Sequence, residues 1–448
     1  MVKWRSILSI RPEKILVQVV FFTCAAGAAC AQGSISIPEL GPYIGAEPKI
    51  FDHIPPQPSQ PPAFTIPLRP LGFSTPGPFY LLRRQALVSL DFLDESRLLF
   101  TFRKPGLETR DSAEKDEDEE RKIRAVVVAL PDGKIESEAL WTVPDRARYL
   151  WILKDGQFLL RDSEGLEQGD ATLKTKPYVH TAGRLLWVEL DPARQVIVIN
   201  WLAPANNQDR TSDGSSPTTS VDASVSSSGT LTPGRQQTLV VQTLRRESGE
   251  VIRTIRVPWD SQSQDWPINV DGFVESARGD GPRWALKLTP FSGGTGHAVG
   301  QVESNCPPNA VFVTEETMLV DTCAVGGGGK LAAISIANGE RIWEVTTATN
   351  EMWPLLVSSP DGSRVALETL ALKRPAASYR HKKLVGAKDL QGQMVRMIDM
   401  ADGTMKLEAP LTPIIDAGGN VAISPSGRRV AILNDGAIEV FELPAARQ

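Results

Sequence analysis

Residues that commonly perform catalysis are sparse in this chain and form no recognisable catalytic motif. The histidines are far apart, and none has the spacing to another His or Cys that a zinc site requires. They are His53, His180, His297 and His381. The glycine-rich segment 292–297 lacks the lysine and the following helix of a phosphate-binding P-loop. No Gly-x-Ser-x-Gly nucleophile elbow is present. We therefore predict no catalytic residue, no metal site and no cofactor.

Two strongly charged segments are the best candidates for contacting a partner. They are Asp116, Glu117, Asp118, Glu119 and Glu120, and Arg380, His381, Lys382 and Lys383. They lie in two polar stretches, 108–122 and 373–392, and a third stretch, 204–237, is rich in Ser, Thr, Asn and Gly. Because such compositions cannot build a core, we expect surface loops. One interpretation is that these loops are disordered and merely tolerated. The other is that they form a contact surface for a partner, because loops on a rigid scaffold often carry binding residues.

The N-terminal residues have the features of a signal peptide. Basic residues precede an apolar stretch at 15–29, and Ala29-Cys30-Ala31 supplies the small residues that signal peptidase recognises. We predict a signal peptide over residues 1–31 and export to the periplasm or the extracellular space. An uncleaved anchor helix is the alternative, although the stretch is short for a bilayer. No later segment is long and apolar enough to cross a membrane.

Cys306 and Cys323 are the two cysteines that follow the signal peptide. Export would place them in an oxidising compartment. They flank a predicted hairpin, and with its turn centred between Thr314 and Glu315, Cys306 falls opposite Cys323. The Cβ atoms of such facing residues are about 4.5–5.5 Å apart, within reach of a disulfide. We predict this disulfide, with two free buried thiols as the alternative.

The composition is that of a globular protein with many turns, because glycine and proline are plentiful and spread along the chain. The formal net charge is −5 at pH 7, and a nucleic-acid partner needs a clustered basic surface, so we predict no nucleic-acid partner. Residues 32–78 are rich in proline, which disfavours helices and central strands. We expect these residues to form a solvated, proline-rich linker.

From about residue 79 the chain is a series of short apolar runs separated by turns, and one pattern recurs. An apolar strand is followed by a turn that carries glycine, and then by a second strand. The copies are 126–134, 240–250, 332–340 and 395–404. In each copy Asp, Asn or Ser precedes the glycine, which supplies the positive φ that a tight hairpin needs.

A second type of hairpin precedes these copies, for example at 355–367 and 421–432, where proline and glycine share the turn. The two hairpins together make a four-stranded antiparallel unit. The units start near Leu87, Tyr149, Leu185, Ile268, Ala310, Leu355 and Val421. Such a sheet has two bare edges and two apolar faces, and radial stacking buries those faces. We therefore predict an all-β fold, a β-propeller of about seven four-stranded blades over residues 79–448.

These repeats resemble the blades of a known class of propellers. Ser-Pro-Asp-Gly-Ser-Arg-Val-Ala at 359–366 and Met-Ile-Asp-Met-Ala-Asp-Gly-Thr at 397–404 are similar to the two hairpins of a blade in bacterial WD40-like (PQQ/YVTN-type) propellers. The paired Gly-His and Trp-Asp signatures of true WD40 repeats are absent. The segment 333–343 resembles the tryptophan-docking repeat of quinoprotein propellers, although Ser335 and Asn338 depart from that pattern. This resemblance implies that Trp343 packs between two blades.

The last unit has only three strands, because few residues follow the strand at 437–443. We expect Phe79-Tyr80-Leu81-Leu82 to supply the fourth strand and close the ring. Strands of a blade alternate in direction, so all connections between second and third strands lie on one face of the disc. The three polar stretches are such connections, in blades one, three and six.

These features predict an exported, non-catalytic propeller that acts as a monomeric scaffold. It would bind a protein or a cell-envelope component through the face that carries the three polar stretches. The alternative is a propeller enzyme, a hydrolase, lyase or lactonase, with its site at the central channel. The enzyme would need several Asp, Glu, Asn or His side chains that converge on the channel from the starts of the innermost strands.

Overall fold

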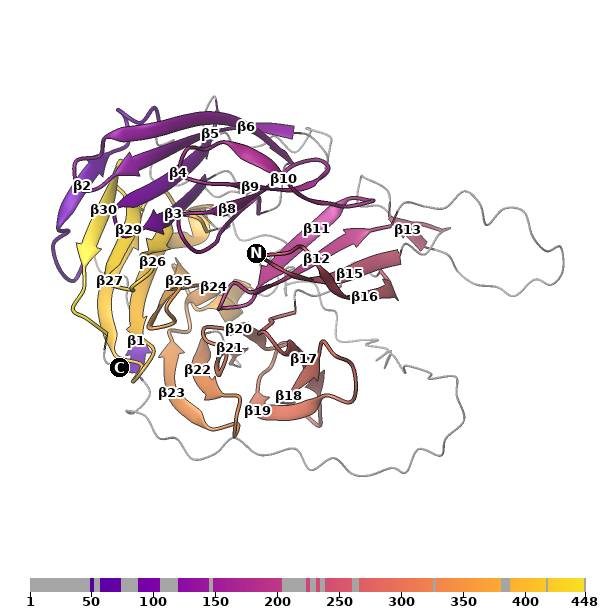
Figure 1. Cartoon of the computed structure of the whole chain (residues 1–448). Helices are drawn as coiled ribbons and strands as arrows, with labels where there is room; N and C mark the ends of the chain where they lie inside the picture. The colour runs from indigo at the N-terminus through magenta and orange to yellow at the C-terminus, as the bar shows by residue number, and fades with distance from the viewer. Residues whose placement is uncertain are drawn as a thin grey trace, which may run out of the picture.

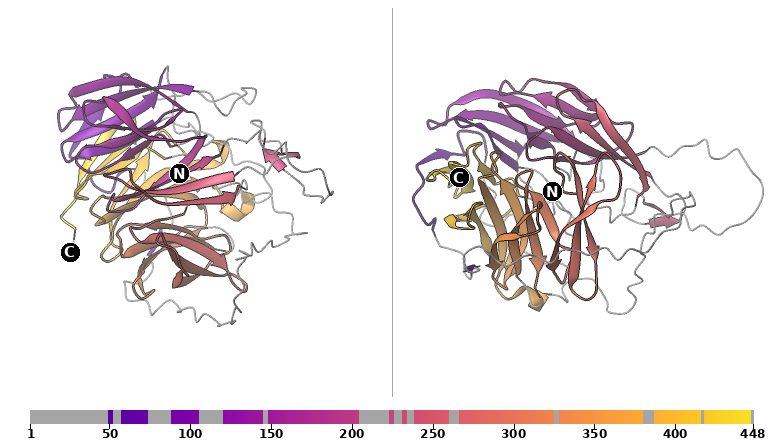
Figure 2. Two further views of the ribbon diagram at one scale, coloured as in Figure 1. Left: turned by 45° about the vertical axis from the view of Figure 1, so that its right-hand side comes forward. Right: turned by 60° about the horizontal axis from the view of Figure 1, so that its bottom comes forward.

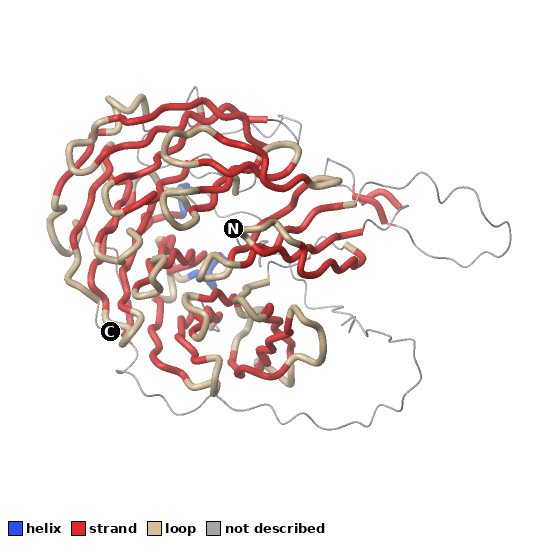
Figure 3. Tube along the Cα trace, in the orientation of Figure 1, coloured by secondary structure: helices blue, strands red, loops and turns tan. Residues whose placement is uncertain are grey.

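The computed structural model describes residues 49–51, 57–73, 88–104, 120–144, 148–203, 223–225, 231–233, 238–259, 266–324, 328–379, 387–415 and 418–446. Nearly all of this part of the chain is strand or turn (Figure 3), with two short 3-10 helices, η3 (Ala376–Tyr379) and η4 (Ala387–Asp389). None of the described helices has the length and apolar character needed to span a bilayer.

The strands form seven antiparallel blades arranged in a ring, as Figures 1 and 2 show from three directions. Blade one contains β3 (Val88–Asp94), β4 (Arg97–Arg103), β5 (Glu120–Ala129) and β6 (Ile135–Pro144), and blade two contains β7 (Leu150–Ile152), β8 (Phe158–Arg161), β9 (Gly165–Gly169) and β10 (Thr175–His180). Blade three contains β11 (Leu185–Leu190), β12 (Val196–Leu202), β15 (Thr238–Arg245) and β16 (Val251–Pro258), and blade four contains β17 (Gly272–Arg278), β18 (Arg283–Pro290) and β19 (His297–Glu303).

The remaining blades are five, six and seven. Blade five contains β20 (Asn309–Phe312), β21 (Thr317–Cys323), β22 (Gly329–Ser335) and β23 (Arg341–Thr347), and blade six contains β24 (Glu351–Ser358), β25 (Arg364–Leu372), β26 (Leu390–Asp399) and β27 (Met405–Leu411). Blade seven contains β28 (Val421–Ile423), β29 (Arg429–Asn434), β30 (Ala437–Glu442) and β2 (Phe64–Pro67). The predicted all-β propeller and the predicted blade starts are therefore confirmed.

The turns between third and fourth strands adopt the conformation that their glycines predict. Gly133, Gly339 and Gly403 have φ values of 71°, 72° and 68°, in the left-handed region. A side chain there is strained, and a Cβ atom on Gly403 would lie 2.9 Å from the Trp343 ring. The repeat thus places glycine where neighbouring blades approach closely.

Seven apolar clusters close the ring, and each joins two neighbouring blades. In the cluster between blades seven and one, for example, Val440 and Ile438 pack with Leu98 and Phe100. The other six clusters each join one pair of consecutive blades, from blades one and two round to blades six and seven. Because every sheet is covered on both sides, the second strands β12 and β25 are buried along their whole length.

Blade four departs from the regular pattern. Its first strand is reduced to one isolated bridge between Ile268 and Phe273, so β17 is the second strand of the blade. The third-to-fourth turn of a blade contacts the outermost strand of the preceding blade: Gly403 of blade six lies against β23, the fourth strand of blade five. In the same way, a Cβ atom on Gly339 of blade five would lie 3.2 Å from the carbonyl oxygen of Val299 in β19. This correspondence identifies β19 as the fourth, outermost strand of blade four.

The ring is closed by a strand other than the one predicted. β2 pairs antiparallel with β30, with Phe64 opposite Val440 and Pro67 opposite Ala437. The prediction that Phe79–Leu82 fills this place was wrong, and those residues lie outside the described part of the chain. Ile66 is buried in the cluster between blades seven and one, so β2 has the inward apolar side chain that a closing strand needs.

The predicted linker, 32–78, therefore contains part of the propeller. Besides β2, it contributes β1 (Lys49–Phe51), which pairs in parallel with β23 at the edge of blade five. Between these strands, the Ser59 amide donates to the Glu408 carbonyl oxygen of blade six at 2.8 Å. Beyond β2, Phe73 is buried against Phe100 and Phe102 of blade one. The described parts of this segment thus follow the outer edges of blades five, six and seven and end at blade one.

The three long connections leave the ring on one face, which we name the insertion face. They join β4 to β5 (104–119), β12 to β15 (203–237) and β25 to β26 (373–389), always a second strand to a third. In the middle one, β13 (Ala223–Val225) pairs with β14 (Leu231–Pro233). Two of the predicted stretches were three residues too long, because Glu120 and Leu390 already begin strands. The opposite face carries the turns between first and second strands, and we name it the turn face.

The predicted disulfide between Cys306 and Cys323 is present, with a Cα–Cα distance of 5.6 Å. The strand register differs slightly from the expected one, since Asn309 pairs with Asp321 and Phe312 with Met318. Strand β20 begins only at Asn309, so the cysteine pair lies just beyond the ladder. The Ser304 hydroxyl oxygen accepts a hydrogen bond from the Cys323 amide at 3.0 Å, which holds the two segments together there.

Replacement of both cysteines, Cys306→Ser with Cys323→Ser, is expected to lower the free energy of unfolding by about 3 kcal/mol. The crosslink closes a loop with a sequence separation of 17, and loops of this size restrict the unfolded chain by roughly that amount. Urea denaturation measures the loss. A reducing agent should lower the stability of the wild type to that of the double variant and leave the double variant unchanged. Equal stability of the two proteins under oxidising conditions would contradict the prediction.

Trp343 packs between two blades, as the quinoprotein resemblance implies. It is buried in the cluster that joins blades five and six, with Ile398 and Met400. Its indole Nε1 donates to the Met400 carbonyl oxygen at 2.8 Å. Trp343 therefore anchors blade five to the third-to-fourth turn of blade six.

Candidate functional site

Glu315 lies in the first-to-second turn of blade five, on the turn face, and its side chain binds the corresponding turns of blades three and four. It lies between β20 and β21 of blade five, and its Oε1 accepts a hydrogen bond from the Ala193 amide of blade three at 2.9 Å. Its Oε2 accepts from the Val270 amide of blade four at 2.8 Å. The reduced first strand of blade four lets this one side chain reach both neighbours.

Asp191 lies beside Glu315 and forms an acid pair with it. Its Oδ1 accepts from the amides of Gln195 and Val196, both at 2.6 Å. Burial raises the pKa of Asp191, and the neighbouring carboxyl group of Glu315 raises it further. A carboxyl group whose pKa is raised by burial and by a neighbouring acid is a feature that acid–base catalysts also use. Here, however, both Glu315 oxygens and one Asp191 oxygen also bind backbone amides.

Further charges lie near the inner strands of blades one to three. Burial raises the pKa of Asp91 in β3, while a hydrogen bond from the Ser89 hydroxyl and the charge of Arg148 lower it. Burial and the charge of Arg148 lower the pKa of Arg194, and nearby Asp191 raises it. Arg194 has a φ of 59°, so the turn that follows β11 is held in the left-handed region. Asp91 and Asp191 therefore each lie near an arginine on this side of the ring.

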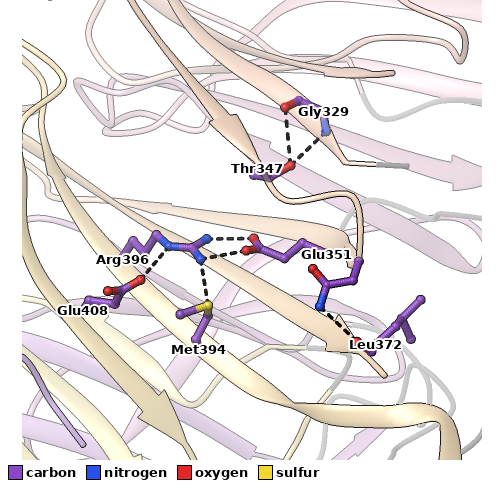
Figure 4. A network of polar contacts seen from close by, with 8 residues as sticks. Gly329, Thr347, Glu351, Leu372, Met394, Arg396 and Glu408 are labelled. Carbon is purple, nitrogen blue, oxygen red and sulfur yellow. Dashed lines mark hydrogen bonds and ion pairs between the residues drawn. The ribbon is translucent and has the colours of Figure 1, made fainter. Parts of the chain in front are cut away.

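A buried ionic network lies in blade six and is drawn in Figure 4. The fully buried guanidinium of Arg396 donates from Nη1 and Nη2 to the two oxygens of Glu351, at 2.7 Å each. Its Nε donates to Oε1 of Glu408 at 3.0 Å, and Nη2 also faces the sulfur of Met394 at 2.9 Å. Since Glu351 begins the first strand and Glu408 lies in the fourth, this network ties the inner edge of the blade to its outer edge.

A second buried polar group lies between blades six and seven. Glu368 in β25 accepts from Nε2 of Gln393 at 3.3 Å, and Oε1 of Gln393 accepts from Asn420 at 3.1 Å and from the Ile415 amide at 2.9 Å. Burial raises the pKa of Glu368 to about 8, so its carboxyl group stays protonated at neutral pH. The network is therefore neutral, and it aligns the start of β28 with blade six.

Glu368→Gln is expected to flatten the pH dependence of stability. The folded protein keeps a proton on Glu368 that the unfolded chain releases above its ordinary pKa of about 4.5, so stability falls as the pH rises from about 4.5 to about 8. Glutamine keeps the hydrogen bond to Gln393 without a proton to lose. We expect similar melting temperatures for the two proteins at pH 4.5 and a higher one for the variant at pH 8. Parallel pH profiles would contradict this.

The described residues contain no group of three or more His, Cys, Asp or Glu side chains placed to hold a metal ion. At the starts of the innermost strands, Glu351 is engaged by Arg396, and Asn420 is fully buried beside Gln393. The acidic pair Asp191–Glu315 lies at the opposite ends of those strands. Glu351 and Asn420 are therefore engaged within the blades and are not free for the convergent set that the enzyme interpretation requires.

The predicted contact residues fall mostly outside the described chain. Only Glu120 is described; it is exposed and pairs with Pro144 at the start of β5. Asp116 to Glu119 and Arg380 to Lys383 lie outside the described residues. Of the histidines, His180 is exposed and lies 3.8 Å from Glu164, and His297 is exposed at the start of β19.

Sequence reasoning missed the acid pair and both buried networks. Asp191, Glu315, Glu368 and Arg396 stand alone in apolar or turn segments, and the acidic, basic or amide side chains that they meet are 12 to 124 positions away in the chain. One signal was present: β25 and β26 are apolar runs, so an Arg or Glu within them must be buried or must interrupt the strand. That signal marks the residue, but it does not identify the partner.

No protein-family model matches the chain, and no curated protein matches it. Solved structures do resemble it. Uncomplexed acylaminoacyl peptidase from Pyrococcus horikoshii is 10% identical over 80% of this chain and 52% of the peptidase, with a TM-score of 0.46. Oligogalacturonate lyase in complex with manganese is 12% identical over 80% of this chain and 97% of the lyase, with a TM-score of 0.40. Hsv2p of Kluyveromyces lactis is 13% identical over 81% of this chain and 99% of that protein, with a TM-score of 0.38.

The chain spans about half the length of the peptidases that it resembles. Likeness at these identities concerns the fold alone and says nothing of substrate or partner. The assignment of this chain as a seven-bladed β-propeller rests on its own strand pairing and on the seven clusters between its blades.

Proposed function

We propose that this chain is an exported, monomeric propeller scaffold that binds a protein or a cell-envelope component on its insertion face. The observation that carries the proposal is the placement of three long connections on that one face, in blades one, three and six. Rigid scaffolds commonly carry their binding residues on such loops. The charged residues Asp116 to Glu120 and Arg380 to Lys383 belong to two of these connections or border them.

Two further features support export and a scaffold role. The Cys306–Cys323 disulfide suits an oxidising compartment, in keeping with a signal peptide over residues 1–31. Two acids of the ring are engaged in contacts within the fold: Glu315 accepts hydrogen bonds from backbone amides of blades three and four, and Glu351 is paired with Arg396 inside blade six. The repeats also suit the bacterial WD40-like class, whose blades they resemble.

Site-specific photocrosslinking tests which face is used. A photoreactive residue would replace Lys104, Ala203 or Lys373, each of which flanks a long connection on the insertion face. The matched control positions are Asp132, Ser248 and Ala401, which lie in turns of the same three blades on the turn face. In cells that express the full chain, we expect one adduct of defined mass from the insertion-face positions and none from the controls.

Two outcomes would overturn the proposal. One is an adduct from the turn-face positions only. The other is an unchanged adduct after removal of all three connections, since binding would then not involve them. Separately, detection of the chain with residues 1–31 intact in the cytoplasm would contradict the proposed export.

The second candidate is an enzyme, a hydrolase, lyase or lactonase, and the acid pair Asp191–Glu315 is the observation that favours it. A buried carboxyl group with a raised pKa can act as a general acid near neutral pH. Chromogenic esters and lactones provide the test. Turnover by the wild type that falls about 100-fold or more in both Asp191→Asn and Glu315→Gln would favour the enzyme, because loss of a general acid commonly costs that much. No turnover above background would favour the scaffold.

A further inference from the structure

The sequence contains a single Asp–Pro peptide bond, between Asp191 and Pro192. This bond lies in the turn between β11 and β12 of blade three, on the turn face. When such a bond is broken, proline departs as a secondary amine, which accepts a proton readily. The carboxyl group of the aspartate can attack its own carbonyl carbon through a five-membered ring, so the attacking and the attacked groups belong to one residue.

The carboxyl group of Asp191 is buried, and its two oxygens differ in their contacts. Oδ1 accepts hydrogen bonds from the amides of Gln195 and Val196, both at 2.6 Å, which fixes the side chain in the turn. Oδ2 is also buried but accepts no hydrogen bond. Carboxyl groups of Asp and Glu form covalent intermediates in other proteins, and an oxygen with unengaged lone pairs is available for such an attack. Oδ2 is therefore the candidate nucleophile.

The carbonyl group of the Asp191–Pro192 bond is polarised by Arg194. Its oxygen accepts hydrogen bonds from the Arg194 amide and from Arg194 Nη1, both at 3.0 Å. Two donors at one carbonyl oxygen, one of them charged, stabilise the negative charge that develops when the carbon is attacked. Arg194 itself has a left-handed φ of 59°, a strained conformation of the kind that clusters at functional sites. The turn thus provides an oxyanion site for its own peptide bond.

Glu315 holds the other side of the bond. Its Oε1 accepts from the amide of Ala193, the residue that follows Pro192, at 2.9 Å. Burial raises the pKa of Asp191 to about 6, and the carboxyl group of Glu315 adds to the increase. Asp191 is therefore protonated at mildly acidic pH, where an exposed aspartic acid is ionised. Pro192 and Ala193 are half-buried and Gln195 is exposed, so water can reach the turn.

We propose that the Asp191–Pro192 bond is a self-cleavage site. Oδ2 of Asp191 attacks the carbonyl carbon of the same residue and forms a cyclic anhydride. The bond from this carbon to the Pro192 nitrogen breaks, and the carboxyl proton passes to that nitrogen. Water then opens the anhydride and leaves two carboxyl groups on Asp191. The net reaction consumes one water molecule, and because it needs no external substrate or partner it rests on neither function proposed above.

The two fragments stay together after cleavage. β11 precedes the broken bond and β12 follows it, and the two strands pair from Leu185 opposite Trp201 to Leu190 opposite Ile197. Residues of both strands also belong to the apolar cluster between blades two and three. The product is thus a two-chain propeller that carries a new amino terminus and a new carboxyl terminus on its turn face.

Mass spectrometry of the full chain, denatured after incubation at about pH 5.5, tests the proposal because most Asp191 is protonated there. We expect two fragments, one that ends at Asp191 and one that begins at Pro192, and a single folded species in size-exclusion chromatography before denaturation. The same chain kept in urea at the same pH is the matched control. There the bond lacks its surroundings and should be cut at least about 10-fold more slowly. An uncut folded chain, or equal rates in the two solutions, would overturn the proposal.

Variants assign the parts of the site. Arg194→Met removes the charged donor to the carbonyl oxygen and is expected to slow cleavage about 100-fold, a common cost of one lost oxyanion donor. Pro192→Ala replaces the leaving group and should slow cleavage about 10-fold or more. Arg256→Met, at an exposed arginine on β16 of the same blade, is the control and should cleave as the wild type does. Melting temperatures verify folding; if Arg194→Met does not fold, Pro192→Ala decides. Undiminished cleavage in the folded variants would point to a contaminating protease and refute self-cleavage.

Discussion

A chain that starts at Phe79 is expected to lose the folded propeller, whereas a chain that starts at Gln57 is expected to keep it. The shorter chain lacks β2 and leaves β30 as a bare edge in the closing blade. It also lacks Ile66, Leu68 and Phe73, which are 1–3% exposed in the cluster that joins blades seven and one. Circular dichroism melting and limited proteolysis distinguish the two chains.

The size of this effect follows from burial. Each large apolar side chain that becomes fully buried contributes about 1.5–3 kcal/mol. Loss of the three therefore removes about 5–9 kcal/mol, comparable with the whole net stability of an ordinary domain, about 5–15 kcal/mol. If the two chains melted within a few degrees of each other, the closing role of β2 would be refuted.

A pair of point variants separates this effect from the loss of chain length. Ile66→Asp places a charge in the cluster and is expected to unfold the full chain or destabilise it severely. Thr65→Asp puts the same charge on the adjacent, exposed position of the same strand and is expected to have little effect. Similar losses in both variants would point to a general intolerance of charge in β2 and would contradict the burial argument.

Arg396→Met is expected to lower the free energy of unfolding by about 3–5 kcal/mol. The substitution leaves Glu351, whose side chain is 3% exposed, without its partner, and an orphaned buried charge is far more costly than the pair is stabilising. Urea denaturation at pH 7 measures the loss.

The matched control for this variant is Arg429→Met. Arg429 pairs with Glu442 in a comparable cross-strand geometry at 3.0 Å, but their side chains are 31% and 57% exposed. Solvent screens such a pair, and its loss should cost no more than about 1 kcal/mol. Equal losses for the two variants would show that burial of Glu351 is not the cause.

The sequence by itself determined the local units of this protein. Turn types, strand boundaries and blade starts depend on residues within about ten positions of one another. Examples are Gly133 and Gly403, whose positive φ values match the predicted hairpins. The Cys306–Cys323 disulfide, with a sequence separation of 17, could be predicted because a single hairpin joins its two ends. The position of Trp343 between blades followed from a resemblance in one short segment.

The tertiary structure alone decided which distant segments meet. Nothing local distinguishes β2 from other short apolar runs, and its pairing of Ile66 with Ile438 becomes favourable only when seven blades bring the ends of the ring together. The contacts of Glu315 with Ala193 and Val270 likewise require that three blades converge on the axis. Side-chain patterns report which face of a strand is buried, but the identity of a long-range partner depends on how the ring closes.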